Sequence, residues 1–423
     1  MSKSVVILGT LDTKGEHLHL LKKDIEKRGH RGLILDLSMG SVPAYPADIP
    51  AADVALAAGH NMEQLVAARN RSASTDVMIA GAQLKVAELL SKKQLDGIVA
   101  MGGASMALIA SRVMAKVPFG IPKVIATPAA MPTYIAEWFG ALDVVVMQVI
   151  MEFAGMNNLV TAAIAQVGGA VSGMVEEAFD YTSLKLPYPS IAITQIGFNE
   201  QCAVQVKRLL EERGYNVYPF HANGISDRSM ERLIAEGFLD GLIDIVPAGL
   251  IEELFQGNRA AGMERLDAPI ARGFPLVLAP STLNVTGAGP TRRMKERFID
   301  RPRIQIDEIR YMTRYSPDEM RQGARLYAEK LNRARGPVKF LVPLRGWSSV
   351  DKPGSVLYNP EEDRVFFEEL NAHLTTAIPI EEVDCNLEDQ EFAQALVESF
   401  DRVFKELQGQ EAGASVGTMR NND

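Results

Sequence analysis

The chain is poor in the residues that would identify several common classes of protein. Only two of its 423 residues are cysteines, Cys202 and Cys385, so it has neither a disulfide framework nor a thiolate metal cluster. Neither the H-E-x-x-H pattern of zinc proteases nor the G-x-S-x-G turn of serine hydrolases occurs. Such low cysteine content is typical of the reducing cytoplasm, and we expect a cytoplasmic protein.

The chain also lacks an excess of positive charge and a long apolar run. Its 44 basic and 53 acidic side chains give a net charge of −9, so we do not expect nucleic acid as a partner. The longest uncharged stretch, Phe153–Val175, contains too many polar residues and glycines for a lipid span, and we expect no membrane partner. Met1–Lys14 has the pattern of a strand and a turn rather than of a signal peptide.

What the chain does contain is a repeated strand and helix pattern. Hydrophobic residues make up 47% and charged residues 23%, as in globular proteins, and the length favours two domains. The apolar runs Val5–Leu8 and Leu33–Leu37 flank an amphipathic segment, Lys14–Arg28. This βαβ order makes the two strands parallel.

Similar units continue on both sides of a segment that lacks any periodicity. This segment, Phe179–Pro189, has the composition of a linker. The sequence therefore predicts an α/β protein with two doubly wound, mostly parallel, Rossmann-like subdomains. We place the domains at residues 1–180 and 190–407, followed by a mobile tail at 408–423.

Two segments near the end of the first domain carry more specific expectations. Val144–Met151 is almost continuously apolar, which predicts a strand covered on both faces. Met156–Glu176 is predicted to be a helix in which Ala165, Gly169 and Gly173 recur every four residues. Small residues at this spacing permit close packing, either inside the domain or between two subunits.

Ligands of open α/β sheets gather at the carboxyl ends of the strands, so the residues after each apolar run are informative. Gly9–Gly15 follows the first strand. Backbone amides and the hydroxyls of Thr10 and Thr13 are suited to phosphate, Lys14 to its charge, and Asp12 to magnesium. The spacing is not that of a Walker loop. The alternative is an ordinary turn in which Asp12 or Thr13 caps the helix.

Two further turns add to this prediction. Gly102 and Gly103 follow a second strand and allow a ligand to approach the backbone closely, and Ser105 adds a hydroxyl at the helix start. Thr127 ends a third strand. Two glycine turns on one sheet favour a phosphate site more than either does alone.

The second domain offers candidate catalytic residues at two strand ends. His221 follows the strand Tyr215–Phe220 and is suited to acid/base chemistry, or alternatively to capping the next turn. Arg345 and Asp351 follow another strand and are suited to holding an acidic substrate between the domains. The alternative is a loop held together by an Arg345–Asp351 ion pair.

Several motifs occur in an order that resembles one protein family. They are Gly9–Gly15, Gly81–Ala82, Pro118–Lys123, Ala154–Asn157, Gly173–Val175, Phe220–Ala222 and Pro343–Gly346 with Asp351. Together they resemble the ATP-binding domain family named after the resistance protein that blocks tomato mosaic virus RNA replication. The resemblance extends over about Ser4–Phe404.

This resemblance implies ATP and magnesium bound in the N-terminal subdomain, and a homodimer or a higher homo-oligomer. Carried over by position, Gly9, Thr10, Asp12, Thr13 and Lys14 match the family and keep their phosphate role.

The chain departs from the family pattern in several loops. Gly102–Ala107 and Ala126–Met131 have fewer glycines or hydroxyls than the family, and Asn223–Asp227 replaces a glycine-rich run. We therefore interpret the chain as a divergent paralogue.

Two hypotheses about function remain open at this point. The first is an enzyme of small-molecule metabolism that binds ATP-Mg or another phosphorylated ligand and acts on an acidic substrate. The second is a non-catalytic, regulatory nucleotide-binding homodimer. A role with viral RNA rests on the resemblance alone.

Overall fold

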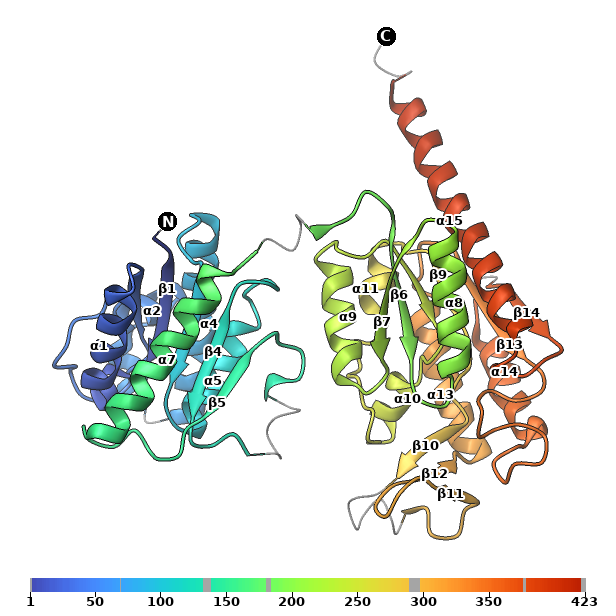
Figure 1. Cartoon of the computed structure of the whole chain (residues 1–423), viewed down its shortest axis with the longest axis horizontal. Coiled ribbons are helices and arrows are strands. Elements are labelled where there is room, and N and C mark those ends of the chain that lie inside the picture. Colours follow the sequence, from blue (N-terminus) through green and yellow to red (C-terminus); the bar gives the residue numbers. More distant parts are fainter. Residues whose placement is uncertain are drawn as a thin grey trace. The chain divides into compact units, whose positions relative to one another are not determined.

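The chain folds into two α/β units, which are drawn in Figure 1. A computed structural model describes residues 2–68, 70–131, 138–179, 184–288, 297–375 and 378–419, with side chains as far as Gln408. Unit 1 is Met1–Leu184 and unit 2 is Lys185–Asp423. The predicted linker lies partly outside the described residues.

Unit 1 contains a sheet of five parallel strands in the order β2-β1-β3-β4-β5. The strands are β1 (Ser4–Gly9), β2 (Arg31–Asp36), β3 (Gly97–Met101), β4 (Lys123–Thr127) and β5 (Val145–Gln148). The first four consist almost entirely of buried residues, as expected for parallel strands with helices on both sides.

Helices cover both faces of this sheet. Alternate residues of β1 divide between two cores: Val5 and Ile7 belong to one, and Val6 and Leu8 to the other. The first core is completed by α1 (Leu11–Lys27) and α7 (Asn158–Glu176), and the second by α2 (Ala51–Ala57), α4 (Arg71–Ser91) and α5 (Ala104–Met114). Figure 1 shows α1 and α7 side by side. A short helix, α3 (Met62–Ala67), follows α2.

Unit 2 contains six parallel strands in the order β14-β13-β9-β8-β6-β7. They are β6 (Ser190–Gln195), β7 (Asn216–His221), β8 (Gly241–Asp244), β9 (Leu276–Leu278), β13 (Val338–Pro343) and β14 (Ile380–Val383). The predicted fold class, two doubly wound and mostly parallel subdomains, is confirmed.

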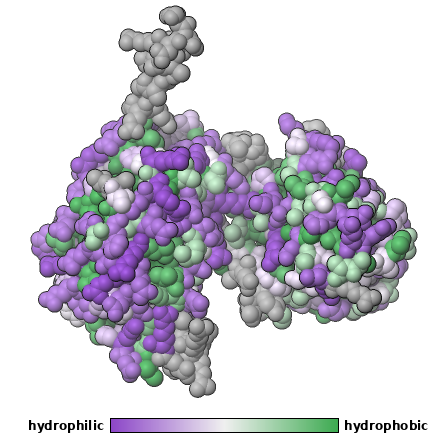
Figure 2. All heavy atoms as spheres, turned by 180° about the vertical axis from the view of Figure 1, so that it is seen from behind, coloured by the Kyte–Doolittle hydropathy of each residue, from purple (hydrophilic) through white to green (hydrophobic). Residues whose placement is uncertain are grey.

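The helices of unit 2 and its sheet share one hydrophobic core. Helices α8 and α15 contact each other, and α13 contacts α14, α10 and α11. The helices are α8 (Glu200–Glu212), α9 (Ile225–Ala235), α10 (Gly249–Leu254), α11 (Asp267–Ala271), α13 (Pro317–Leu331), α14 (Pro360–His373) and α15 (Gln390–Met419). In Figure 2, hydrophilic residues cover much of the face of both units.

A small antiparallel sheet that the sequence did not predict follows β9. Its strands are β10 (Val285–Ala288), β12 (Tyr311–Arg314) and β11 (Arg303–Gln305), in the order β10-β12-β11. Strands of three or four residues are too short to show a clear alternation of apolar and polar side chains. Residues 289–296, between β10 and β11, lie outside the described part of the chain.

Two expectations about element ends and burial are corrected. The strand predicted over Val144–Met151 is not covered on both faces, because β5 is the edge strand of its sheet and Val145 is 41% exposed. The predicted tail at 408–423 begins inside α15, which continues through Met419. Alanine, glutamine and glutamate, which favour helix, dominate the first residues of that segment.

The close approach predicted for the small residues of α7 occurs at a different residue. Gly168 packs against α1, where an added Cβ would lie 3.3 Å from the Cβ of Asp24. Of the three predicted residues, Gly169 also lies close to a neighbour, since an added Cβ would lie 3.2 Å from Arg28 Nη2, whereas Ala165 and Gly173 are exposed. Among the described residues, α7 is the one helix long and apolar enough to cross a membrane. Its valine and isoleucine side chains are buried in unit 1, as in a core helix of a globular domain.

Candidate functional site

The two glycine turns of unit 1 lie where the strand order of the sheet reverses. The chain passes from β1 to β2 on one side and then returns to β3 on the other side of β1. Gly9–Lys14 therefore follows β1 and Gly102–Ser105 follows its neighbour β3, while Thr127 ends β4, the next strand. Open α/β sheets bind ligands at this reversal point. The structure brings the three predicted segments to the same edge.

The amides at the start of α1 are already bonded within the protein. The N–H of Leu11 donates to Asp36 Oδ1 and that of Asp12 to Ser38 Oγ, both over 3.0 Å. The N–H groups of Thr13 and Lys14 donate to the carbonyl of Thr10. Neither Asp12 nor Thr13 caps the helix, so the capping proposed in the alternative for this turn is wrong, although the turn bonds its amides internally as an ordinary turn does. These four amides are not free to bind a phosphate.

Lys14 is held by the segment that follows β5. Its Nζ donates to the carbonyl oxygen of Phe153 over 2.5 Å, and the ring of His17 hydrogen-bonds to the carbonyl of Gly155 over 2.9 Å. The backbone of Lys14 departs from helical geometry, with φ −130° and ψ 19°. An ammonium group has three donors, so two N–H groups of Lys14 remain for a ligand.

The hydroxyls of the first turn point toward each other. Thr10 Oγ1 and Thr13 Oγ1 lie 2.7 Å apart, and Thr13 is exposed. Asp12 Oδ2 accepts from the N–H of Gly40 over 3.0 Å, whereas Asp12 Oδ1 is buried and has no hydrogen-bond partner. This unpartnered carboxylate oxygen is a suitable first ligand for a hard cation such as magnesium.

Within the described residues, no group of three or more histidine, cysteine or acidic side chains is arranged to hold a metal. Magnesium commonly binds to proteins through one or two carboxylates, with phosphate and water completing its shell. Asp12 therefore fits magnesium only if the ion arrives with a phosphorylated ligand.

The glycines of the two turns serve different purposes. A Cβ on Gly9 would lie 2.5 Å from the side chain of Leu18, and one on Gly102 would lie 2.7 Å from Cβ of Met106. These two glycines let each strand end pack under its own helix. A Cβ on Gly103, in contrast, would meet nothing within 4 Å, so open space adjoins that residue.

Open space at Gly103 coincides with an uncapped helix start. Gly103 is the N-cap of α5, no side chain of the described residues caps the helix, and its first turn contains no acidic residue. The first amides of a helix lack partners inside the helix and carry partial positive charge. Ser105 is exposed in the same turn, while Thr127 is buried and its Oγ1 accepts from the N–H of Ala129. The start of α5, rather than that of α1, has the features of an anion site.

The three catalytic candidates of unit 2 do not come together. His221 is the exposed last residue of the edge strand β7. Arg345 follows β13, four strand positions away, which corresponds to about 19 Å. The guanidinium of Arg345 forms a bidentate pair with Asp384, with distances of 2.8 and 2.7 Å. Arg345, predicted to hold an acidic substrate, is thus paired with Asp384 at an exposed position.

Asp351 is buried in a polar cluster instead of pairing with Arg345, so the predicted Arg345–Asp351 pair is wrong. Asn284 Nδ2 donates to Asp351 Oδ2 over 2.7 Å and to Asp363 Oδ1 over 2.9 Å. Arg314 Nη2 donates to Asp363 Oδ1 over 2.6 Å. The cluster joins β12, α14 and the loops after β9 and β13.

One of these two carboxyl groups stays protonated well above its usual range. Burial and, to a smaller extent, the negative charge of Asp351 raise the pKa of Asp363 to about 7, although Arg314 opposes the shift. Burial also raises the pKa of Asp351. Two carboxylates that share one amide and one guanidinium resist losing both protons.

The reversal point of the sheet in unit 2 is filled by charged side chains. The fully buried Arg265 donates to Asp227, Glu231 and Asp244, over 3.2, 2.9 and 2.6 Å. Asp244 ends β8 and also accepts from Thr194 of β6 over 2.8 Å. Burial raises the pKa of Glu231 and of Asp244. We assign this cluster to stability rather than to ligand binding.

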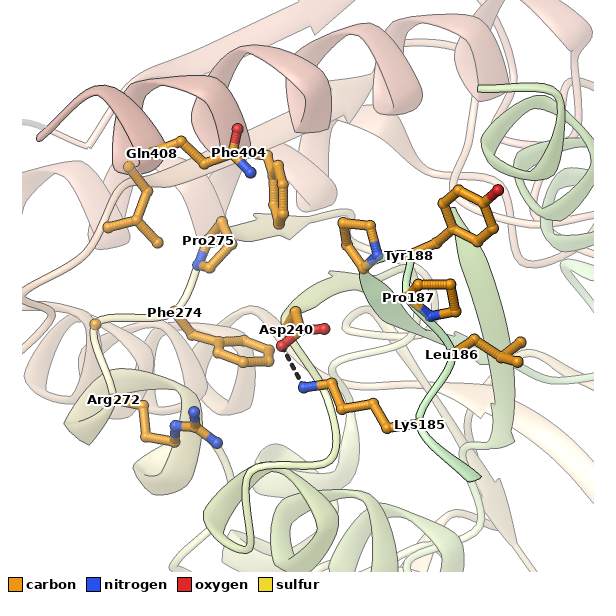
Figure 3. Close-up of a pocket in the computed structure, with 13 residues that line it drawn as sticks. Lys185, Leu186, Pro187, Tyr188, Asp240, Arg272, Phe274, Pro275, Phe404 and Gln408 are labelled. Carbon is orange, nitrogen blue, oxygen red and sulfur yellow. Dashed lines mark hydrogen bonds and ion pairs between the residues drawn. The ribbon is translucent and has the colours of Figure 1, made fainter. Parts of the chain in front are cut away.

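The cavity drawn in Figure 3 lies at the opposite, amino-terminal edge of the same sheet. It encloses about 400 Å³, and its lining includes Pro189, Asp240 and Pro275, which directly precede β6, β8 and β9. Lys185 reaches into it and pairs with Asp240 over 2.8 Å. Ligands of open α/β sheets bind at the carboxyl edge, so we assign no function to this cavity.

Sequence reasoning missed the polar residues that decide these arrangements. Asp36 and Ser38 bond to the start of α1, and Asn284, Arg314 and Asp363 surround Asp351. The position of Asp36 at the end of a predicted strand was the one available signal. The partners of Asp351 lie far away in sequence and had none.

Comparison with known proteins identifies relatives over the whole length of the chain. Models of the N-terminal and C-terminal domains of an uncharacterised protein family, UPF0261, match residues 3–180 and 188–404. A UPF0261 protein of Clostridium tetani is 32% identical over 398 residues, which cover 94% of this chain and 98% of that protein. A UPF0261 protein of Brucella suis is 28% identical, with 95% and 96% covered.

The resistance protein that the sequence motifs resembled is also related. The ToMV resistance protein Tm-1(GCR237) of Solanum lycopersicum is 29% identical over 315 residues, covering 73% of this chain and 42% of that protein. Among solved structures, a UDP-N-acetylglucosamine 2-epimerase covers 97% of both chains at 9% identity, with a TM-score of 0.21. A TM-score this low carries no argument about fold or function.

Proposed function

The chain belongs to the uncharacterised protein family UPF0261, and from that premise we propose that unit 1 binds the phosphate groups of a nucleotide, with ATP-Mg as the first candidate. One observation carries the proposal: the uncapped start of α5 and the open space at Gly103 lie at the reversal point of the sheet. Helix starts at such points bind anions through their amides.

We propose that the predicted residues bind phosphate, with the main donors at the start of α5 instead of the start of α1. The amides of Gly103, Ala104 and Ser105 are the proposed phosphate donors, and the Ser105 hydroxyl adds another. Thr10 and Thr13 contribute hydroxyls from the neighbouring turn.

Charge at this site comes from two residues of the first turn. Lys14 contributes its remaining ammonium donors, and Asp12 Oδ1 is the proposed ligand for magnesium that arrives with the nucleotide. Gly9 and Gly102 support the site only by letting the strand ends pack under their helices.

We also propose that the protein is an enzyme of small-molecule metabolism, and we limit this proposal to phosphorylated ligands. The acidic substrate depended on Arg345, whose guanidinium is bonded to Asp384. His221 remains a candidate acid or base, because it is exposed at a strand end. The two free cysteines fit the proposed location in the cytoplasm.

Calorimetric titration of ATP, with and without magnesium, tests the nucleotide site, and inorganic phosphate serves as a second titrant. Ser105→Glu places a carboxylate at the second position of α5. There its negative charge interacts favourably with the helix dipole, so the fold should be kept, but it repels a bound anion. Ser72→Glu is the matched control, since Ser72 is exposed at the second position of α4.

We expect Ser105→Glu to weaken ATP binding by about tenfold or more, equivalent to ~1.4 kcal/mol of repulsion. Ser72→Glu should bind as the wild type does. Equal affinity in both variants would remove α5 from the site, and no binding of ATP or phosphate by the wild type would end the proposal.

The second candidate function, a regulatory homodimer without catalysis, is favoured by the exposed side of α7. Leu159 is 53% exposed, Ala162 and Ala165 are exposed, and α7 contains no charged residue before Glu176. Light scattering tests this: Ala162→Arg should turn a dimer into a monomer, whereas Ala80→Arg, on an exposed position of α4, should not. A monomeric wild type would eliminate this candidate.

A further inference from the structure

A second cavity of unit 2, distinct from the one in Figure 3, adjoins the buried carboxyl pair. It encloses about 450 Å³ between α14 and the edge strand β14, at the carboxyl end of β13. Carboxyl ends of parallel strands are where α/β sheets bind ligands. We call it the α14 pocket.

One wall of the α14 pocket is apolar. Val342 and Trp347 are almost completely buried, and Phe367 is partly exposed. The rings of Trp347 and Phe367 pack edge to face, with centroids 5.6 Å apart. A rigid apolar surface of this kind is suited to the hydrocarbon part of a small molecule.

Asp363 presents one free carboxylate oxygen at this wall. The residue is 5% exposed and lines the pocket. Its Oδ1 accepts from Asn284 and from Arg314, over 2.9 and 2.6 Å, while Oδ2 takes part in neither bond. The network therefore fixes the orientation of the carboxyl group and leaves Oδ2 for a ligand.

The rim of the pocket is predominantly acidic. Glu368 of α14 and Glu382 of β14 are exposed, and one cation, Arg364, lines the pocket with them. Within the described part of the chain, none of these three side chains belongs to an ion pair that the structure records. With Asp363 ionised, the three carboxylates that line the pocket outnumber the guanidinium of Arg364 and that of Arg314, which is bonded to Asp363, so the pocket attracts a positively charged group.

We propose that the α14 pocket binds an organic ammonium, with its charged nitrogen at Asp363 Oδ2 and its apolar body against Trp347 and Phe367. The opposite class, an organic anion, would face three carboxylates, and a neutral ligand would offer Asp363 Oδ2 no charged donor. This inference is independent of the nucleotide site of unit 1.

Binding should depend on pH, because Asp363 must be ionised to attract the ammonium. Burial raises the pKa of Asp363 to about 7, within the range where a primary ammonium remains fully charged. The charged groups around Asp363 are Arg314 of β12, Asp351 after β13, Glu362 and Arg364 of α14, and Glu382 of β14. Arg314 lowers the pKa of Asp363 and Asp351 raises it, so the ionisation belongs to the pair.

The test uses 2-phenylethylamine as the probe and the fluorescence of Trp347 as the signal. The chain has two tryptophans, so Trp138→Phe, a substitution in unit 1, leaves Trp347 as the only reporter. A ligand of this size reaches a dissociation constant on the order of 1 mM. 2-Phenylethanol and phenylacetate have similar shapes and are the neutral and anionic controls.

We expect a saturable change with the amine and binding at least about tenfold weaker for the alcohol and the acid, as the loss of a charge pair implies. Between pH 6 and pH 8 the affinity for the amine should rise by up to about tenfold, as Asp363 ionises. Equal binding of all three probes, or no saturation with the amine, would overturn the proposal.

Variants separate the buried carboxylate from the rim. Asp363→Asn keeps an oxygen acceptor for Arg314 and Asn284 and should abolish both the tight binding and its dependence on pH.

Glu368→Gln removes an exposed charge and should weaken binding of the amine by about two- to fivefold, as expected for an exposed charge. Glu361→Gln is the control, because it removes the same charge from α14 outside the pocket. If Glu361→Gln weakened binding as much as Glu368→Gln, the effect would be general charge rather than a site.

Discussion

Both sheets of the protein reverse their strand order, but the two reversal points are occupied in different ways. In unit 1, the point between β1 and β3 is bordered by Gly103, by the uncapped start of α5 and by hydroxyls. In unit 2, the point between β6 and β8 contains the buried Arg265 and its three acidic partners. The same topology thus leaves open space beside Gly103 in one unit, whereas charged side chains occupy the corresponding point in the other.

The largest effect is expected where the buried carboxylates around Arg265 lose that guanidinium. Arg265→Leu leaves Asp227, Glu231 and Asp244 without a guanidinium and should lower the free energy of unfolding by about 3–5 kcal/mol. Arg345→Leu, which breaks the exposed pair with Asp384, should change the free energy of unfolding far less. Urea unfolding followed by circular dichroism measures both, and similar losses would contradict the contrast between the buried and exposed pairs.

The pH dependence of unit 2 should reflect the carboxyl pair. The pKa of Asp363 is raised to about 7, so the folded state holds a proton that the unfolded chain releases near pH 4. This group therefore reduces stability as the pH rises from about 4 to 7, by a few kcal/mol at about 1.4 kcal/mol per pKa unit. Asp363→Asn should flatten the profile over that window, and an unchanged slope would show that Asp363 does not retain the proton.

The two adjacent glycines of the second turn should respond differently to the same substitution. Gly102→Ala places a Cβ 2.7 Å from that of Met106 and should cost about 1–3 kcal/mol. Gly103→Ala meets nothing within 4 Å and should change stability by less than about 0.5 kcal/mol. Thermal unfolding of the two variants therefore tests whether there is open space at the proposed phosphate site. A large loss of stability in Gly103→Ala would show that there is none.

The smallest effect concerns the start of α1. Asp36→Ala removes the acceptor for the N–H of Leu11 and for Ser38, and should cost about 1 kcal/mol, as the loss of a helix cap does. Asp36→Asn keeps an oxygen acceptor and should lose less. Equal losses for alanine and asparagine would show that the negative charge, rather than the hydrogen bond, matters here.

The sequence was sufficient for the architecture because many of the parallel strands are apolar runs followed by amphipathic helices. The runs at Val5–Leu8 and Leu33–Leu37 became neighbouring strands β1 and β2 for that reason. The sheet of β10, β11 and β12 could not be predicted, since its strands are too short to show a period.

The location of the candidate site was also predictable, but its hydrogen bonds were not. Glycine turns at strand ends indicate where a ligand can approach, and the structure places both at the reversal point. Which donors remain available depends on groups far away in sequence. The carboxylate of Asp36 accepts from the N–H of Leu11, and the backbone carbonyl of Phe153 accepts from the Lys14 ammonium across 139 residues. Such pairings follow from tertiary packing, which local patterns do not encode.

The bonds from Lys14 and His17 to Phe153 and Gly155 have a consequence for local opening of unit 1. The edge strand β5 is four residues long, and the chain after it is attached to α1 through these two side chains. Because β5 is a short edge strand, its amide hydrogens should exchange sooner than those of the central strands. The bonds to Lys14 and His17 slow this opening, so neutralising Lys14 should make the exchange faster. A ligand that takes the Lys14 ammonium away from the carbonyl of Phe153 would therefore increase the rate of deuterium uptake along β5, although it does not contact that strand.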